Sequence, residues 1–379
     1  MDFDLSEEHQ IFRETVSKFS QNEIAPLGAE HDQKEEYPRW MFNKAGELGF
    51  LGIPYPEKYG GTGPDTTALA IFAEEITKAD AGISMGLIVQ TTVGTSPLYN
   101  FGSEEIKQKY LIPAIKGEMV GSFALTEPNV GSDISSIQAT AREDGDSFIL
   151  NGTKIFVSNG MSADYAVVAA RTEKGSSGHK GISLFLVETN SPGFSRTGLK
   201  KLGIRAQDIA EFVLEDCRVP KANLLGEQGK GFYHLVSTVQ TTRIIVGASS
   251  VGLAKTAFNT ALEYAKERQQ FGQSIGNFQG IQFMFADMAT EIEMASLMVY
   301  KAAFLNDKGI KCTKEASMAK LFASEMVNRV AYKALQIHGG YGYMREFPLE
   351  RYFRDARIME IFEGTSEIQR VIISRELGL

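Results

Sequence analysis

Hydrophobic residues in the first third of the chain recur at the spacing of an α-helix. Phe12, Val16 and Phe19 lie at positions i, i+4 and i+7, so they share one face of a helix. Ser6 precedes this pattern, and Glu7 and Glu8 directly follow Ser6, which is typical of a helix N-cap with acidic residues in the first turn. The spacing recurs further along, and it predicts a helical domain over residues 1–120.

After residue 120 the pattern changes to short β-rich runs. Residues 148–150 and 153–157 are two such runs, and Asn151-Gly152 lies between them. Asn-Gly is the strongest short-range hairpin signal, because both turn residues tolerate a positive φ. No long helical pattern interrupts the further runs, so an antiparallel β domain is predicted over residues 121–225.

Helical spacing returns at Gly226 and continues to the last residues. Two long helices are predicted over residues 282–305 and 316–337, and Gly339-Gly340 is a plausible end for the second. The order of helices, strands and helices predicts a multidomain α+β protein whose third domain, residues 226–379, is helical.

The composition of the chain argues against several classes of protein and of binding site. Lys and Arg total 39 and Asp and Glu total 47, which gives a net charge of −8 and argues against a nucleic-acid binder. The two cysteines, Cys217 and Cys312, are too few for a disulfide framework or a Cys-rich metal site, so no metal is expected. No apolar run is long enough for a membrane span, and the acidic start lacks a signal peptide. We therefore expect a soluble, cytoplasmic protein, or a mitochondrial matrix protein if the chain is a processed eukaryotic one.

One motif suggests a different class of enzyme. Gly82, Ser84 and Gly86 match the G-x-S-x-G nucleophile elbow of esterases. An elbow needs a strand before its serine, whereas Ser84 follows a predicted helix. Ser84 is therefore interpreted as a small residue at a helix contact, and the esterase is kept only as an alternative.

Four segments together carry a more specific chemistry. They are Phe123 to Asp133 (FALTEPNVGSD), Lys154 to Gly160 (KIFVSNG), Gln336 to Gly342 (QIHGGYG) and Ile361 to Arg370 (IFEGTSEIQR). In this order, on a chain of 379 residues, they resemble the acyl-CoA dehydrogenases of the bacterial short- to medium-chain, butyryl-CoA dehydrogenase-like type. The resemblance runs over nearly the whole chain. It implies an N-terminal helical domain, a central antiparallel β-barrel or sandwich, and a C-terminal four-helix bundle.

The resemblance also implies the reaction, which is FAD-dependent α,β-desaturation of an acyl-CoA to the 2-enoyl-CoA. A base removes the α-proton, and flavin N5 takes the β-hydride. Glu363 matches the catalytic glutamate of the family, whereas Thr242, at the position that carries the glutamate in a subset of members, cannot be a base. The residues themselves add that Gly364 breaks the chain direction, and that Ser366 with Gln369 forms a capping box at the start of a helix.

The resemblance assigns FAD contacts to the matching positions. In the first two segments the matches are Phe123, Leu125, Thr126, Gly131, Ser132, Phe156, Val157 and Ser158. Phe156 stands where the family often has tryptophan, and Ser158 where it usually has threonine. The neighbouring subunit is expected to contribute Arg268, Phe271, Gln279, Gln336, Gly339 and Gly340. Thr365 and Glu367 follow the base, although the family often has glutamine at the second of these positions.

The acyl-CoA itself is expected to contact Ser132, Gln240, Arg243 and Gly364. Gln240 departs from the acidic residue or asparagine that is usual there. Ser84 matches the position of an arginine in the glutaryl-CoA members, so a dicarboxylic substrate is not expected. The resemblance further implies a homotetramer built from dimers and electron transfer to an electron-transfer flavoprotein. An acyl-CoA oxidase that uses O₂ is the alternative within the class.

Overall fold

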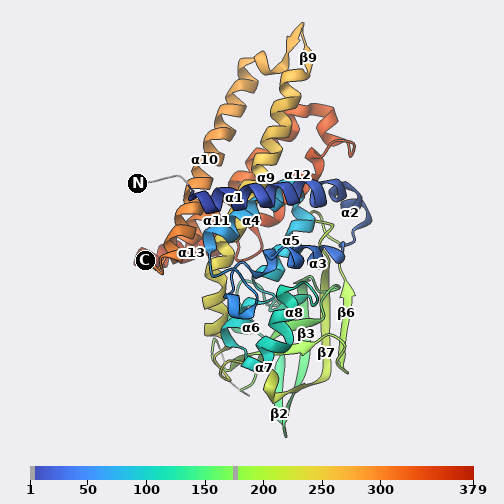
Figure 1. The fold of residues 1–379 in the computed structure, drawn as a ribbon, viewed down its shortest axis with the longest axis vertical. Helices are drawn as coiled ribbons and strands as arrows, with labels where there is room; N and C mark the ends of the chain where they lie inside the picture. Colours follow the sequence, from blue (N-terminus) through green and yellow to red (C-terminus); the bar gives the residue numbers. More distant parts are fainter. Residues whose placement is uncertain (1–4, 174–177) are drawn as a thin grey trace.

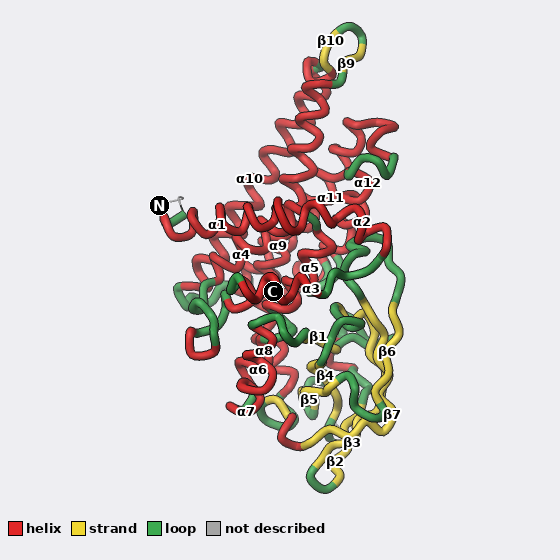
Figure 2. The backbone as a smooth tube through the Cα atoms, turned by 45° about the vertical axis from the view of Figure 1, so that its right-hand side comes forward, coloured by secondary structure: helices red, strands yellow, loops and turns green. Residues whose placement is uncertain are grey.

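The first helices of the protein lie around the middle of an elongated molecule. A computed structural model of the chain describes residues 5–173 and 178–379. Figures 1 and 2 show the large sheet at one end of the molecule and a small hairpin at the other, with long helices between them. Ser6 accepts a hydrogen bond from the backbone N–H of His9, so the expected N-cap is confirmed. The N-terminal helices are α1 (Glu7–Phe19), α2 (Gly28–Lys34), α3 (Trp40–Glu47), α4 (Thr66–Ala79), α5 (Ala81–Thr91), α6 (Ser96–Phe101), α7 (Glu104–Ile106) and α8 (Ile112–Ile115).

The central region folds into one eight-stranded sheet. Its order is β6-β7-β3-β2-β4-β5-β8, with β1 paired to β4. The expectation of an antiparallel sheet is wrong at β4, which pairs in parallel with β1, where Gly121 is opposite Tyr165, and with β2, where Thr140 is opposite Arg171. The long connection between β1 and β4 permits that direction. The strands are β1 (Gly121–Ala124), β2 (Thr140–Asp144), β3 (Ser147–Ser158), β4 (Tyr165–Arg171), β5 (Ile182–Glu188), β6 (Phe194–Gly198), β7 (Ile209–Pro220) and β8 (Leu224–Leu225).

The hairpin predicted at Asn151-Gly152 is also wrong, because both residues lie inside the continuous strand β3. The register with β7 shifts between Leu150 and Gly152, which marks an irregularity of the β-bulge kind. A Cβ on Gly152 would lie 2.6 Å from the Cβ of Ala139, so glycine is needed here for close packing. The turn that does join β2 to β3 contains Gly145, at φ +63°.

The C-terminal region is dominated by three long helices that pack against one another. Figure 1 shows α9 and α10 extending away from the sheet to a small hairpin at the opposite end of the molecule. Gly339 directly follows α11 with φ +58°, as the sequence predicted. The elements are α9 (Gly231–Glu267), β9 (Gln269–Gln270), β10 (Gln273–Ser274), α10 (Gln279–Asp307), α11 (Thr313–His338), α12 (Leu349–Ala356) and α13 (Ser366–Glu376).

The two helical regions share one apolar core, although the sheet separates them in the sequence. Phe50 and Phe72 from the first region are buried in the same cluster as Ile245 and Val327 from the second. Gly252 of α9 allows the close approach, because a Cβ there would lie 2.3 Å from the carbonyl oxygen of Glu74 in α4. A second core packs the sheet against α6 and α8. Among the described residues, no helix has both the length and the apolar character that crossing a membrane requires.

Candidate active site

Glu363 lies in a tight turn between a 3₁₀ segment, η10 (Arg357–Glu360), and α13. Its φ is +53° and that of Gly364 is +89°, so two consecutive residues adopt the left-handed conformation. For a residue other than glycine this costs about 1–3 kcal/mol, and such residues concentrate at functional sites. The fold therefore maintains an unfavourable backbone at the glutamate that the sequence singled out.

Two contacts fix the exit from this turn. Thr365 is the N-cap of α13 and accepts the N–H of Ile368, so the expected cap at Ser366 is wrong. Ser366 is already the first helical residue and no longer has the extended backbone that a cap requires. Gln369 does reach back from the helix, but it donates to the carbonyl oxygens of Glu363 (3.2 Å) and Gly364 (2.9 Å). The Gln369 side chain therefore closes the turn by bonding carbonyl groups.

The Glu363 carboxylate is held against the middle of α9. Thr242 Oγ1 donates a 2.9 Å hydrogen bond to Glu363 Oε2. Burial raises the pKa of Glu363 above its usual value, whereas the Thr242 bond and the charges of Arg243 and Lys320 act in the opposite direction. Arg243 Nε is buried and has no hydrogen-bond partner among the described residues. A buried donor beside a half-buried carboxylate is the kind of group that a ligand can satisfy.

Gln240, one turn before Arg243, is occupied within the chain. Its Nε2 donates to Asn306 Oδ1 at 3.2 Å, and its Oε1 accepts from Thr313 Oγ1 at 2.9 Å. Asn306 in turn donates to Thr66 at the start of α4. The amide thus links α9 to the end of α10 and the start of α11, and its expected contact with substrate stays a prediction.

The loop after β1 carries the first group of expected flavin contacts, and hydrogen bonds and an ion pair hold it against β3. Lys154 of β3 is fully buried, and its Nζ lies 2.7 Å from Glu127 Oε1 and 3.1 Å from the carbonyl oxygen of Leu125. Glu127 also accepts the backbone N–H groups of Gln138 and Ala139. The backbone of Thr126 is bonded to β3 as well, through the N–H of Ile155 at 2.9 Å. Thr126 is half-buried here, and Gly131 and Ser132 are exposed further along the same loop.

The end of β3 presents an aromatic ring to the surface. Phe156 is 62% exposed and has a φ of +59°, which is a second non-glycine residue in the left-handed region at a predicted site position. Val157 is buried, Ser158 is half-buried, and Phe123 is half-buried on β1. An exposed ring on strained backbone, with a hydroxyl group two residues away, fits the edge of a planar, partly polar cofactor such as a flavin.

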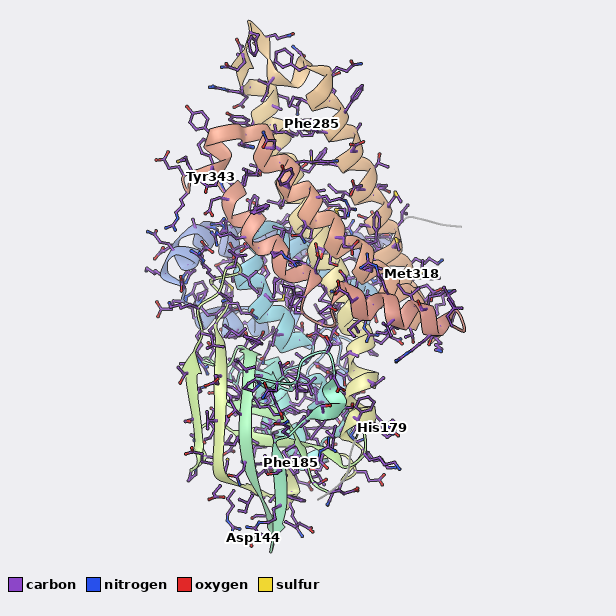
Figure 3. The ribbon with its side chains drawn as sticks, turned by 180° about the vertical axis from the view of Figure 1, so that it is seen from behind. Asp144, His179, Phe185, Phe285, Met318 and Tyr343 are labelled. Carbon is purple, nitrogen blue, oxygen red and sulfur yellow. The ribbon has the colours of Figure 1, made fainter. Side chains whose placement is uncertain are left out.

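A third group of expected contacts lies far from the first two along the molecule. Arg268 directly follows α9, Phe271 lies in the β9–β10 hairpin with 92% exposure and a φ of +53°, and Gln279 begins α10. Figure 1 shows this hairpin at the opposite end from the sheet. In Figure 3, Tyr343 lies near the same end, Phe185 lies in the sheet, and Met318 of α11 is between them. Gln336, Gly339 and Gly340 are exposed next to this hairpin, where Arg268 stacks on Tyr341 at 5.5 Å. The structure therefore does not bring this group to Phe156 within one chain.

Three other expectations concern single side chains. The hydroxyl of Thr365 is used as the cap of α13, and Glu367 is exposed in the first turn of that helix. Ser84 is fully buried inside α5, which follows α4 directly. A nucleophile elbow requires an exposed serine after a strand, so the esterase alternative is contradicted.

Sequence reasoning missed Lys154 and Lys320, two lysines that are fully buried in the part of the chain that the structure describes. Lys320 lies on α11 and donates a 2.8 Å hydrogen bond to the carbonyl oxygen of Gly364. A signal was present, because Lys320 occurs at helical spacing with Ala316, Ala323 and Val327, all of which are buried. A charged residue on the buried face of a helix could have been identified as a candidate for a polar role.

Comparison with known proteins identifies the family. Family models for the acyl-CoA dehydrogenase N-terminal, middle and C-terminal domains match residues 6–118, 122–217 and 229–378. The chain belongs to the acyl-CoA dehydrogenase family. The resemblance, the three-part fold class and the FAD-dependent oxidoreductase class expected from the sequence are thereby confirmed.

Individual relatives of this acyl-CoA dehydrogenase match over the full length. A probable acyl-CoA dehydrogenase of Bacillus subtilis is 49% identical, with 100% of both chains covered. The structure of butyryl-CoA dehydrogenase from Megasphaera elsdenii is 40% identical and covers 100% of both chains, with a TM-score of 0.96. A chain in the structure of an electron transferring flavoprotein of Acidaminococcus fermentans is 45% identical, with a TM-score of 0.97 and coverage of 100% and 99%.

Proposed function

We propose that this acyl-CoA dehydrogenase oxidises short-chain acyl-CoA thioesters to the 2-enoyl-CoA, with Glu363 as the base that removes the α-proton. The observation that carries the proposal is the Glu363 turn, in which left-handed backbone holds a half-buried carboxylate against Thr242 and near Arg243. A general base works best when its pKa lies near the operating pH. Burial raises the pKa of Glu363 towards that range, and its polar neighbours keep the carboxylate ionisable.

The residues at the sheet end fit the FAD that the family requires. When bound, FAD supplies the acceptor for the hydride that leaves the β-carbon. Phe156 and Ser158 would contact one edge of the cofactor, and the loop from Leu125 to Ser132 would contact it through Thr126 and through backbone at Gly131. The ion pair between Glu127 and Lys154 holds this loop in place before any ligand arrives. Arg243, whose Nε has no hydrogen-bond partner within the described ranges, would bind the pantetheine or thioester part of the substrate.

The distal group supports a shared site between subunits. Arg268, Phe271 and Gln279 are exposed but lie at the far end of the helices, so they would contact FAD bound to a second copy. Arginine suits the pyrophosphate, because guanidinium forms paired charge-assisted hydrogen bonds. Exposed apolar side chains along α10 would be covered in the same assembly, which we propose is a dimer of dimers. They include Phe283, Met294, Leu297 and Phe304, each between 46% and 59% exposed.

The substrate and the electron acceptor are proposed from the relatives. Similarity to a butyryl-CoA dehydrogenase supports a short acyl chain, and similarity to a chain in an electron transferring flavoprotein structure supports that class of acceptor. The buried Ser84 offers no positive charge, so a dicarboxylic substrate is not proposed.

Anaerobic titration tests the base and the substrate together. Butyryl-CoA should bleach the flavin absorbance of the purified holoenzyme. Glu363→Gln should retain FAD and lose bleaching by at least about 100-fold, the usual contribution of a general base. Glu376→Gln is a matched control, because it removes a carboxylate at the other end of α13. A Glu363→Gln enzyme that bleaches at the normal rate would mean that another residue removes the proton.

The oxidase alternative has its own measurement. A dehydrogenase reduced by butyryl-CoA should pass electrons to an electron-transfer flavoprotein and form little hydrogen peroxide in air. Rapid peroxide formation at the rate of turnover would favour the oxidase instead.

A further inference from the structure

Lys320 is a buried cation in an unusual setting. Its side chain is fully buried, and among the residues that the structure describes it has no carboxylate within ion-pair distance. It donates a hydrogen bond to the carbonyl oxygen of Gly364, at 2.8 Å. Buried charges are normally paired, and an unpaired one is costly. This acceptor belongs to the turn that holds Glu363, so the ammonium group lies at the proposed active site.

The acceptor of this bond is the carbonyl group of Gly364, the residue that directly follows the proposed base. Gly364 O accepts from Lys320 on α11 and from Gln369 on α13, so two helices hold one carbonyl group. Gly364 and the preceding residue, Glu363, both have positive φ. The Lys320 bond thus bears on the backbone that determines where the Glu363 side chain points.

The charge of Lys320 also faces the site. The ionisable groups that influence it are Glu363 in the turn, Glu360 in η10, Arg243 on α9 and Glu325 on α11. Burial lowers the pKa of Lys320 to about 8, so the ammonium form predominates at neutral pH. For Glu363, the groups that favour the ionised form are Thr242, Arg243 and Lys320. Lys320 therefore acts on the base from α11, whereas Thr242 and Arg243 act on it from α9.

We propose that Lys320 is a positioning residue for the Glu363 base: its ammonium group holds the Glu363–Gly364 turn and places a positive charge near the carboxylate. This inference rests on the proposed function of Glu363. Two effects follow from it. Loss of the hydrogen bond misplaces the base and lowers the limiting rate of flavin reduction. Loss of the charge favours the protonated carboxyl group, so the rate begins to fall at a higher pH as the solution is acidified.

Two substitutions separate these effects. Lys320→Met removes both the bond and the charge, whereas Lys320→Gln removes the charge and keeps a donor for Gly364 O. The reductive half-reaction with butyryl-CoA is followed by stopped-flow spectroscopy from pH 5 to 9, on enzyme of verified FAD content. Both variants should shift the acid limb of the rate profile to higher pH. Lys320→Met should also lower the limiting rate by about 10- to 100-fold, the scale expected for a misplaced catalytic group.

The controls decide between this role and a structural one. Lys311→Met removes an exposed lysine that pairs with Glu376 on α13, and its profile should match the parent enzyme. Gln369→Leu removes the other donor to Gly364 O and leaves the charge, so it should lower the limiting rate without moving the acid limb. Lys320 variants that lose FAD, fail to fold, or keep the parent profile would overturn the proposal. A Glu363→Gln enzyme with normal bleaching would instead contradict the proposed function, so the two failures are distinguishable.

Discussion

Lys154 and Lys320 are both fully buried, yet their surroundings differ. Lys154, in β3, contacts the carboxylate of Glu127, which is itself bonded to two backbone N–H groups. Lys320, in α11, donates to a carbonyl group and has no paired carboxylate among the described residues, and the carboxylate that most influences its pKa is the proposed base. Burial lowers the pKa of both lysines, because a charged group is poorly solvated away from water.

The difference suggests two uses of one residue type. A lysine paired with its own carboxylate, here called a closed pair, can hold a loop in place. Its charge is largely cancelled by the carboxylate, so the pair has little electrostatic effect on other groups. A lysine without such a partner keeps its charge available to a neighbouring group. In this molecule the closed pair holds the loop assigned to FAD, and the open charge lies near the assigned base. Each consequence of this comparison can be tested by substitution.

The largest expected effect concerns the closed pair. Glu127→Ala leaves the Lys154 ammonium buried without its carboxylate, and breaking a buried ion pair in this way costs about 3–5 kcal/mol of unfolding free energy. Urea denaturation of the holoenzyme should show the loss, together with reduced FAD content. The double variant Glu127→Gln with Lys154→Met should recover much of the stability, because no unpaired charge remains and the glutamine oxygen can still accept a backbone N–H. If the double variant were no more stable than Glu127→Ala, the cost would not come from the buried charge.

The second expected effect is the pH dependence that Lys320, the open charge, gives to the free energy of unfolding. Lys320 has a folded-state pKa of about 8, below its ordinary value near 10.5. Between these two pH values the unfolded chain retains the proton and the folded chain does not, so this group makes stability rise as the pH rises. The full contribution is about 3 kcal/mol, since one pKa unit corresponds to roughly 1.4 kcal/mol. The unfolding free energy of Lys320→Met should rise less than that of the parent from pH 8 to 10. Parallel curves would show that folding does not lower the pKa of Lys320, and that burial therefore does not disfavour its charged form.

The contacts of Lys154 and Lys320 also show what could not be predicted from the sequence. Local patterns predicted the helices and strands, and the four segments predicted the family, because both depend on residues close together in the sequence. The prediction of a turn at Asn151-Gly152 was wrong because this glycine is required for packing against Ala139, which is distant in the sequence. The bonds from Lys154 to Glu127 and from Lys320 to Gly364 also join distant residues, so no local pattern specifies them.

The site assignments divide in the same way. Phe156, Phe271 and Glu363 were selected by their motifs, and all three have positive φ, a property that propensity alone would disfavour. Gln240 was assigned to substrate from its position, and only the fold shows that its amide is bonded to Asn306 and Thr313. A motif can therefore indicate which residue is special, whereas the reason depends on partners supplied by the fold.

The smallest expected effect on stability belongs to Thr242, the residue of α9 whose hydroxyl group contacts the base. Thr242→Val removes the 2.9 Å hydrogen bond to Glu363 Oε2, and the loss of one such bond costs about 1 kcal/mol. The hydroxyl stabilises the ionised carboxylate, so its removal raises the pKa of Glu363 and moves the acid limb of flavin reduction to higher pH. Because this direct bond influences Glu363 more than the charge of Lys320 does, the shift should exceed that of Lys320→Gln. Thr242→Ser keeps the hydroxyl and should retain the parent profile. A larger shift in Lys320→Gln than in Thr242→Val would reverse the comparison and make the open charge the dominant influence on the base.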